Sequence, residues 1–545
     1  MSIPGRGAWI RALLVNLGLL ALGSFLFAAS FPNPLFAGGG ALLAWLAYVP
    51  VFVLIRRVSL RTAALWGALY GYSAYSLFNY WLGAFHPLAG LFVGILYLLW
   101  FTFLFPLLKL ALIFFPRRGY LLQWLIWLAY EYLRTLGFLG YSYGITGYSQ
   151  WSFLPVIQIA DLFGVWAVSA LVVFSSAYIA QGLTSVEVRG FLAGIRREWL
   201  PGLLWTCALI ASLVYGLVMT RDYANRDYSP EETARIALIQ SNESPWADGV
   251  VAYREKFRVL RRLSGEALEA EPQPDLVVWP ETAFAPRIYW HLHYRDDYDS
   301  YEMVELVKEL SAYMEVQEVP FLIGNDDGRK EVNAAGQWER VDYNAAIFFT
   351  PGKEPEIYRK MHLVPFTEHF PYKDRFPGFY QYLLAANTHQ WTAGKEALIF
   401  EQGRLRFATP ICFEDTFGDL PREFVLGGAN FLANISNDAW SGTLSCQMQH
   451  LGMAVFRAVE NRRSLVRATA TGQTCGIGPD GRIIAMAEPF TETVLALDIP
   501  LLEEQSLYTR LGDILGQIFV ILALIILFSG AAWRIIKSIK ERRTA

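Results

Sequence analysis

The sequence predicts a two-part membrane protein in which an α/β domain lies between transmembrane helices. Of its 545 residues, 54% are hydrophobic and 17% are charged, whereas soluble proteins average about 25% charged residues. The apolar residues gather in long segments before residue 220 and in one segment near the C-terminus. Between these regions, short apolar runs alternate with charged stretches, which indicates buried strands alternating with surface helices.

Eight apolar segments approach or exceed the roughly 20 residues that a helix needs to cross a bilayer. The first resembles a secretory signal, because Arg6 and Arg11 flank its start. Its apolar run is longer than the ~7–15 residues of a signal sequence, so we interpret it as an uncleaved span. The predicted spans are residues 8–31, 35–55, 62–84, 88–115, 120–136, 159–183, 199–219 and 511–533.

Lys and Arg are distributed unequally among the loops between these segments. The second, fourth and sixth loops and the C-terminal tail are basic, whereas the first, third and fifth carry essentially no Lys or Arg. Because basic loops remain in the cytoplasm, we expect both chain ends inside and the α/β domain outside. The basic residues are Arg56, Arg57 and Arg61, then Arg117 and Arg118, then Arg189, Arg196 and Arg197, then Arg534, Lys537, Lys540, Arg542 and Arg543.

The region between the seventh and eighth spans has the pattern of a layered α/β domain. Short apolar runs bounded by Gly, Pro and Asn favour buried strands. Asp480-Gly481 lies between two such runs and predicts a hairpin turn. The predicted strands are residues 234–240, 275–279, 319–324, 344–350, 405–413, 430–435, 465–470 and 474–478, with helices near 251–270, 301–315 and 447–463.

Three residues with complementary chemistry follow apolar runs of this domain. They are Glu281 in Trp-Pro-Glu-Thr, Lys360 in Tyr-Arg-Lys-Met-His, and Cys412 in Thr-Pro-Ile-Cys-Phe-Glu-Asp. A Cys nucleophile has to lose its proton. Glu281 is a candidate general base if partial burial raises its pKa, and Lys360 is a candidate for stabilising the thiolate and an oxyanion. Singly, each residue has a commoner structural explanation, since a Cys in an apolar strand is usually inert core. Together they predict acyl transfer through a thioester.

These motifs resemble the Glu-Lys-Cys triad of the nitrilase, or carbon–nitrogen hydrolase, superfamily. Within it, the chain resembles apolipoprotein N-acyltransferases over nearly its whole length. It departs from that family's usual pattern at five positions, none of them in the triad: Ser241, Thr367, Phe413, Ala470 and Thr471. The other segments that carry the resemblance are residues 131–134, 137–138, 159–165, 240–242, 435–440, 449–450, 467–469 and 508–513.

The resemblance implies an eight-helix transmembrane domain joined to an αββα sandwich. The expected domain boundaries are residues 1–220 for a transmembrane domain of seven spans, residues 221–510 for the nitrilase-like domain, and residues 511–545 for the eighth span and a basic tail. Cys412 would be the nucleophile, Glu281 the general base and Lys360 the lysine on the oxyanion side. The resemblance also implies supporting or substrate-binding roles for Glu368, Glu414, Phe413 and Trp246.

The implied reaction transfers an acyl chain from a phospholipid to the N-terminal amine of the diacylglyceryl cysteine of an apolipoprotein. Its partners would be the phospholipid donor, the apolipoprotein acceptor and the membrane. The protein would be a monomer in a bacterial inner membrane and would need no cofactor. Two alternatives remain open: a membrane-tethered amidase acting on small C–N substrates with the same triad, and a transporter or scaffold that has lost catalysis.

Other residue patterns predict less. The net charge of −3 gives no reason to expect a nucleic-acid partner, and the four cysteines lack the spacing of a metal site. Cys446 and Cys475 could form a disulfide in an oxidising compartment, although spacing alone cannot establish it. Glu131 and Arg134 are three residues apart in an apolar stretch and could pair on one helix face. We interpret His450 as a hydrogen-bonding loop residue.

Overall fold

The computed structural model describes residues 6–85, 87–184, 196–243, 248–294, 301–333, 336–385 and 388–544. The chain forms two compact units. The helical unit comprises Met1–Asp222, Thr443–Gly452 and Leu511–Ala545, and the α/β unit comprises Tyr223–Gly442 and Met453–Arg510. The segment Thr443–Gly452, which we expected in the outer domain, therefore belongs with the helices.

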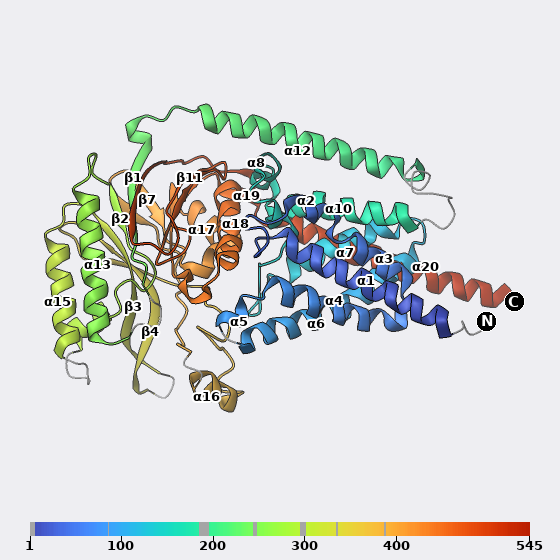
Figure 1. The fold of residues 1–545 in the computed structure, drawn as a ribbon, viewed down its shortest axis with the longest axis horizontal. Coiled ribbons are helices and arrows are strands. Elements are labelled where there is room, and N and C mark those ends of the chain that lie inside the picture. The colour runs from blue at the N-terminus through green and yellow to red at the C-terminus, as the bar shows by residue number, and fades with distance from the viewer. Residues whose placement is uncertain are drawn as a thin grey trace. The chain divides into compact units, whose positions relative to one another are not determined.

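Within the described residues, five helices of the helical unit are long and apolar enough to cross a membrane: α1, α6, α10, α12 and α20 (Figure 1). The helices are α1 (Arg6–Ser30), α2 (Ala41–Ala47), α3 (Val49–Arg57), α4 (Leu60–Phe78), α5 (Leu82–Phe85), α6 (Pro87–Phe114), α7 (Gly119–Leu133), η1 (Thr146–Gln150), α8 (Leu154–Ile157), α9 (Ala160–Phe163), α10 (Val165–Thr184), α12 (Trp199–Asn225) and α20 (Ile514–Thr544).

Three of the eight predicted spans are shorter or interrupted. Residues 35–55 form α2 and α3, which are separate because the chain breaks at Tyr48, just before Pro50 in the first turn of α3. The segment 62–84 forms the 19-residue α4, in which Thr, Ser and Tyr dilute the apolar residues. The segment 120–136 forms the 15-residue α7, after which the chain turns at Gly137 with φ +76°. Within the part of the chain that the structure describes, five helices are thus long and apolar enough to cross a membrane, fewer than the eight expected.

Glu131 and Arg134 at the end of α7 are buried but have different partners. The Glu131 carboxylate accepts hydrogen bonds from the backbone N–H of Thr146, at 3.1 Å, and from its hydroxyl. Arg134 donates to the Tyr97 hydroxyl at 2.6 Å and to the carbonyl of Tyr143 at 2.9 Å. The two side chains fix the segment that follows α7, and the ion pair we expected between them is not what anchors them.

The start of α18 (Leu444–Asn461) belongs to the helical unit. The Tyr80 hydroxyl donates to Ser445 Oγ at 2.8 Å, and Gln449 accepts from Trp81 and donates to the Pro32 carbonyl. His450 is buried on this helix, so the expectation that it lies in a loop was wrong.

The α/β unit contains two six-stranded sheets within the described residues, with strand orders β12-β1-β2-β3-β4-β5 and β11-β10-β9-β8-β7-β6 (Figure 1). The strands are β1 (Thr233–Gln240), β2 (Leu276–Val278), β3 (Phe321–Val332), β4 (Trp338–Phe349), β5 (Glu356–Arg359), β6 (Phe400–Gln402), β7 (Leu405–Ala408), β8 (Phe431–Ser436), β9 (Ser464–Thr469), β10 (Cys475–Ile477), β11 (Ile483–Met486) and β12 (Thr493–Pro500). The remaining helices are η2 (Pro230–Glu232), α13 (Val250–Leu268), α14 (Ile288–His293), α15 (Tyr301–Glu315), α16 (Pro377–Ala385), η3 (Cys412–Thr416), α17 (Asp419–Leu426), η4 (Asp438–Ser441) and α19 (Leu507–Leu511).

Both sheets have the same arrangement of strands. Each has three neighbouring parallel strands, an antiparallel strand beside the first of them, and two antiparallel strands beyond the third. Helices α13, α15, α17 and α18 connect successive parallel strands, as such crossovers require. The sheets pack on one another, since the ring of Phe348 on β4 lies 5.1 Å from that of Phe407 on β7.

Several strand boundaries differ from the prediction. The predicted strand 405–413 ends at Ala408, so Cys412 lies beyond the strand and begins the helical turn η3. The hairpin β3–β4 is several residues longer on each side than the pattern indicated. The Asp480-Gly481 turn is confirmed, because β10 and β11 pair antiparallel on either side of it.

Candidate active site

Four short turns at strand ends meet in the α/β unit. Glu281 lies three residues after β2, Lys360 follows β5 directly, Cys412 begins η3 after β7, and Asn437 follows β8. Strands β2, β7 and β8 belong to parallel sets in the two facing sheets. The carboxyl ends of parallel strands are where open α/β sheets place their ligand sites.

Two polar groups hold the carboxylate of Glu281 in place. Asn344 Nδ2 donates to Glu281 Oε1 at 2.8 Å, and the backbone N–H of Asn437 donates to Glu281 Oε2 at 3.0 Å. Lys360 Nζ lies 3.5 Å from Oε1. The side chain is only 8% exposed, so this carboxylate is a fixed and nearly dry acceptor.

Lys360 lies between two carboxylates. Its ammonium group is fully buried and is 2.8 Å from Glu368 Oε1, while Glu368 Oε2 accepts from the backbone N–H of Val364 at 2.8 Å. Burial by itself lowers the pKa of Lys360, but the charges of Glu368 and Glu281 outweigh that effect and raise it. Lys360 therefore keeps its positive charge at neutral pH. Burial raises the pKa of Glu368, and the charge of Lys360 opposes this increase.

Cys412 is held in an unusual backbone conformation next to these charges. Its φ of +49° lies in the left-handed region, which costs a non-glycine residue about 1 kcal/mol or more and is found at functional sites. Asn434 Nδ2 donates to the Pro410 carbonyl at 3.0 Å and steadies the turn. Burial, followed by the charge of Glu281, raises the pKa of Cys412, whereas Lys360 lowers it. The resting sulfur is therefore a thiol.

Glu414 is a hydrogen-bond acceptor in the turn that begins with Cys412. Its carboxylate accepts from the backbone N–H groups of Ile411, Met361 and His362 at 2.7, 2.7 and 3.0 Å, and from the Tyr358 hydroxyl. Burial raises the pKa of Glu414, and the backbone donors oppose that shift. Glu414 thus joins the turn of Cys412 to the segment that follows Lys360.

The remaining two residues with a predicted supporting role are Phe413 and Trp246. Phe413 is buried and packs edge-on against Phe417, with ring centroids 4.9 Å apart. Trp246, which we expected at the substrate side, lies outside the described residues.

A buried charge network that the sequence did not reveal links two of the turns. Arg467 on β9 forms an ion pair with Asp415 in η3, and its Nη2 lies 3.5 Å from Asp438 Oδ2 in η4. All three side chains are at most 1% exposed. Asp415 is three residues from Cys412, and Asp438 is next to Asn437. Arg467 therefore ties the turn of Cys412 to the turn that holds Glu281.

Sequence reasoning also missed Asn344 and the backbone of Asn437 as partners of Glu281. Asn437 belongs to a segment that carries the family resemblance, which was a usable signal. Asn344 only began a predicted strand, and nothing in its neighbourhood marked its side chain as functional. All four cysteines are described, and none of them forms a disulfide, so Cys446 and Cys475 are not paired in this structure. The described residues contain no group of His, Cys, Asp and Glu that could hold a metal ion.

Comparisons with known proteins place this chain in a family. The family model for the carbon–nitrogen hydrolases matches residues 235–508, and that for the apolipoprotein N-acyltransferase N-terminal domain matches residues 23–178. The chain is 45% identical over 539 residues to apolipoprotein N-acyltransferase 1 of Treponema pallidum, which covers 96% of each chain. The chain belongs to the apolipoprotein N-acyltransferase family.

Other members of the apolipoprotein N-acyltransferase family are similar over comparable lengths. The Treponema denticola apolipoprotein N-acyltransferase 1 is 43% identical and covers 94% of this chain and 95% of its own. The Geobacter metallireducens enzyme is 33% identical over 91% of each. Among solved structures, a carbon–nitrogen hydrolase from Helicobacter pylori is 18% identical, covers 50% of this chain and 90% of its own, and gives a TM-score of 0.36.

Proposed function

We propose that this protein transfers an acyl chain from a phospholipid to the N-terminal amine of the diacylglyceryl cysteine of apolipoproteins. Membership of the apolipoprotein N-acyltransferase family supports the reaction. The observation that carries the mechanism is the buried cluster of Glu281, Lys360 and Glu368 whose charges act on the thiol of Cys412.

In the first half-reaction, Cys412 Sγ attacks the ester carbonyl of the phospholipid. Because the raised pKa keeps the sulfur protonated at rest, the proton passes to Glu281 as the C–S bond forms. The ammonium of Lys360 stabilises the oxyanion. The N–H of Phe413 assists, because donors in the first turn of a helix have no acceptor within it. When the intermediate collapses, Glu281 returns the proton to the departing alkoxide, and lysophospholipid leaves.

In the second half-reaction, the α-amine of the lipoprotein cysteine attacks the thioester. Glu281 accepts a proton from the amine, the C–S bond breaks, and the same proton restores the thiol of Cys412. An amide has formed and no external energy source is consumed, because a thioester is a higher-energy acyl donor than an amide. Glu368 keeps Lys360 charged and in position through both steps.

The membrane part fits this proposal because both substrates are lipids. Withdrawing an acyl chain from the bilayer costs about 0.8 kcal/mol per CH₂, so the thiol has to work at the lipid surface. We place the protein as a monomer in the bacterial inner membrane, with eight membrane segments. Five are the clear spans, and α2–α3, α4 and α7 are the shorter ones. The basic loops lie inside and the α/β unit lies on the outer face.

The proposal is tested by incubating purified protein with phospholipid that carries a labelled acyl chain. Cys412 should acquire a label that hydroxylamine removes, and adding a diacylglyceryl peptide should move the label to the peptide amine. Cys412→Ala should take up no label and should fail to rescue cells depleted of their own enzyme. Rescue by this variant at the wild-type level would contradict the assignment of the nucleophile.

A further inference from the structure

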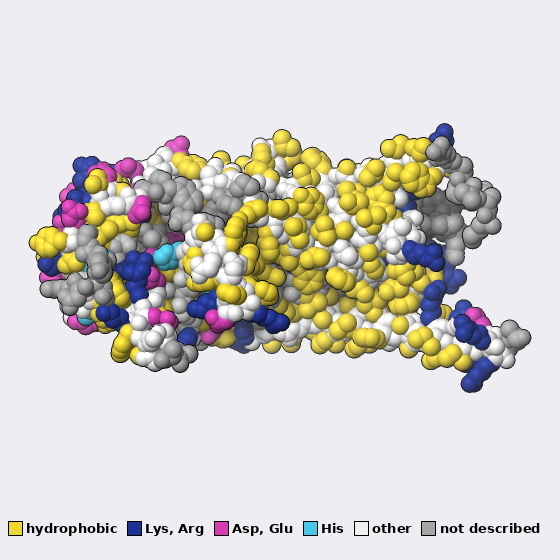
Figure 2. Space-filling model, turned by 90° about the horizontal axis from the view of Figure 1, so that it is seen from below, with side chains coloured by type: hydrophobic (Ala, Val, Ile, Leu, Met, Phe, Trp, Pro, Cys, Tyr) yellow, Lys and Arg dark blue, Asp and Glu magenta, His cyan; other side chains and the backbone are white. Residues whose placement is uncertain are grey.

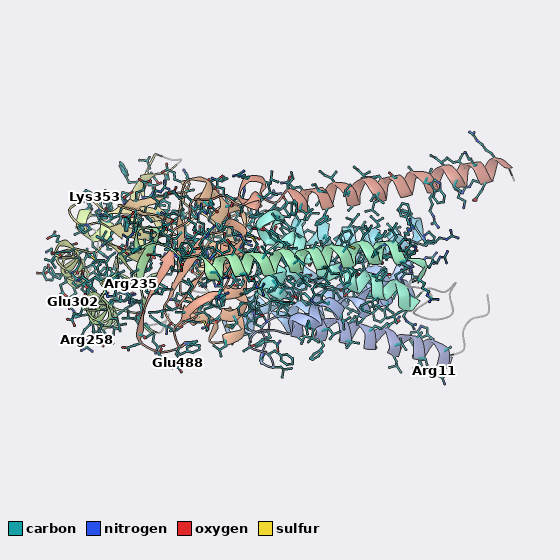
Figure 3. All side chains as sticks on the ribbon, turned by 90° about the horizontal axis from the view of Figure 1, so that it is seen from above. Arg11, Arg235, Arg258, Glu302, Lys353 and Glu488 are labelled. Carbon is teal, nitrogen blue, oxygen red and sulfur yellow. The ribbon has the colours of Figure 1, made fainter. Side chains whose placement is uncertain are left out.

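The helical unit carries most of its charge at one end, where the loops that contain Arg57, Arg117 and Arg197 lie. Figure 2 shows Lys and Arg side chains gathered at this end of an otherwise largely apolar surface, and Figure 3 labels Arg11 there. Among the described residues of these loops and of the α20 tail, the acidic side chains are Glu198 and Glu541. Among these described residues, the basic side chains therefore clearly outnumber the acidic ones.

A cavity of about 640 Å³ opens at this end, which is within the range of roughly 300–1,000 Å³ for ligand sites. Three parts of the helical unit form its walls. The turn between α6 and α7 contributes Phe115, Arg117 and Arg118, the residues before α12 contribute Arg197 and Glu198, and α20 contributes Trp533.

The charges of the cavity favour an anion. Arg118 Nε lies 3.5 Å from Glu198 Oε2, which also accepts from the Tyr120 hydroxyl at 3.3 Å. Glu198 is buried, whereas Arg118 is 65% exposed. Three arginines and one carboxylate line the cavity, so its formal charge is three minus one, or two positive units. Arginine is the side chain best suited to binding a phosphate group.

The apolar part of the wall favours a lipid over a free ion. Phe115 lies next to the end of α6, where a transmembrane helix reaches the membrane interface, and Trp533 is an exposed aromatic residue on α20. Aromatic side chains at this depth lie beside the glycerol and upper acyl groups of lipids. Basic pockets between transmembrane helices on the cytoplasmic side bind anionic headgroups.

We propose that this cavity binds the phosphate group of an anionic phospholipid, whose chains run along Phe115 and Trp533. The lipid would join the α6–α7 turn, the start of α12 and α20. Its phosphate would bring negative charge to a cavity whose described lining carries three arginines and one carboxylate. This site is separate from the catalytic cluster and does not depend on the proposed reaction.

The test compares lipids and charge variants by thermal unfolding of the full-length protein in a neutral detergent. Dioleoyl phosphatidylglycerol should raise the unfolding temperature of the wild type more than dioleoyl phosphatidylcholine does. Arg117→Gln/Arg197→Gln, two exposed positions, should lose most of that difference and bind phosphatidylglycerol roughly tenfold or more weakly, because each basic side chain near the headgroups contributes about 1 kcal/mol. The matched control is Arg11→Gln/Arg61→Gln, which removes two exposed charges from the same end outside the cavity.

The control variant should respond to phosphatidylglycerol as the wild type does. An equal loss in both double variants would overturn the site, because a general surface charge effect would then explain the binding. An equal shift of the wild type with inorganic phosphate alone would overturn the lipid assignment. If the double variant fails to fold, Arg117→Gln alone is compared with Arg61→Gln. An equal loss in these two single variants would then overturn the site.

Discussion

At the scale of residues, the reactivity of the site is set by the charges around one sulfur atom. The Glu281 carboxylate and burial raise the pKa of Cys412, and the Lys360 ammonium lowers it. The Glu281 carboxylate is held in place by hydrogen bonds from the Asn344 side chain and the backbone N–H of Asn437. The Glu281 carboxylate and the Lys360 ammonium thus act in opposite directions on the proton affinity of the Cys412 sulfur.

This balance predicts opposite effects of two substitutions on alkylation. Glu281→Gln removes a negative charge and should lower the pKa of Cys412, so alkylation of Cys412 by iodoacetamide at pH 8 should become faster. Acyl transfer by the same variant should fall by about a hundredfold or more, because the general base is lost. Lys360→Met should raise the pKa further and slow alkylation. In the wild type, the rate should keep rising with pH beyond 9, since thiolate forms only there. Peptide mass spectrometry of Cys412 measures the rates, and slower alkylation of Glu281→Gln would contradict the electrostatic argument.

The sequence was informative about these residues because each follows a strand and carries reactive chemistry. The structure brings Glu281, Lys360, Glu368 and Cys412 together, while their catalytic roles remain predictions. Asn344 could not have been found, because an amide at the start of a strand gives no sign of which carboxylate it will contact. Arg467 lies in a segment that carries the family resemblance, but its two acidic partners lie 52 and 29 residues away along the chain, so no local pattern indicated the charge network.

At the scale of elements, the turns that carry the site depend on close backbone packing. A Cβ atom on Gly324 of β3 would lie 2.7 Å from the Glu281 Cα and even closer to the Pro280 carbonyl. We therefore predict that Gly324→Ala displaces the Glu281 turn, lowers kcat by at least about tenfold and destabilises the fold by about 1–3 kcal/mol. Steady-state kinetics and thermal unfolding measure both effects.

The matched control for this substitution is Gly265→Ala. Gly265 lies on α13, where a Cβ atom would meet nothing within 4 Å, so the change should stabilise the helix by about 0.5–1 kcal/mol and leave kcat unchanged. A wild-type kcat in Gly324→Ala would contradict the prediction, because it would show that the Glu281 turn tolerates the added Cβ atom.

Loss of the buried Arg467 network should likewise lower both the stability of the fold and kcat. Arg467→Met leaves Asp415 and Asp438 buried without their cation, which costs about 3–5 kcal/mol for a buried pair. It also frees η3 from η4, so kcat should fall while KM changes less. Arg482→Met is the control, because Arg482 is 52% exposed and its ion pair with Asp480 is 3.6 Å long, a kind worth about 0–1 kcal/mol. Similar losses in both variants would contradict this assignment.

The elements themselves were only partly predictable. The helix 301–315 and the strands near 234–240 and 430–435 were found to within one or two residues, because they are apolar or amphipathic and clearly bounded. Strand β12 was missed because it is held by pairing with β1, more than 250 residues earlier in the chain, and local patterns carry no sign of that partner. The break between α2 and α3 was missed because apolar composition continues across it.

At the scale of the whole molecule, the unequal distribution of arginines predicts an orientation. A cysteine introduced at Lys353, an exposed position in the α/β unit labelled in Figure 3, should react with a membrane-impermeant maleimide in intact spheroplasts. A cysteine introduced at Arg57, the exposed last residue of α3, should react only after the membrane is permeabilised. The reverse pattern would show that the thiol of Cys412 faces the cytoplasm and would remove the proposed lipoprotein substrate from reach.

The resting protonation of Cys412 also bears on how long the enzyme survives. Peroxides oxidise thiolates far faster than thiols, and damage beyond the sulfenic acid stage is largely irreversible. In the proposed reaction, the sulfur loses its proton only while an ester carbonyl occupies the site, so it would present little target to oxidants between turnovers. We expect an enzyme built this way to outlast, in an aerated envelope, one whose nucleophile is permanently ionised.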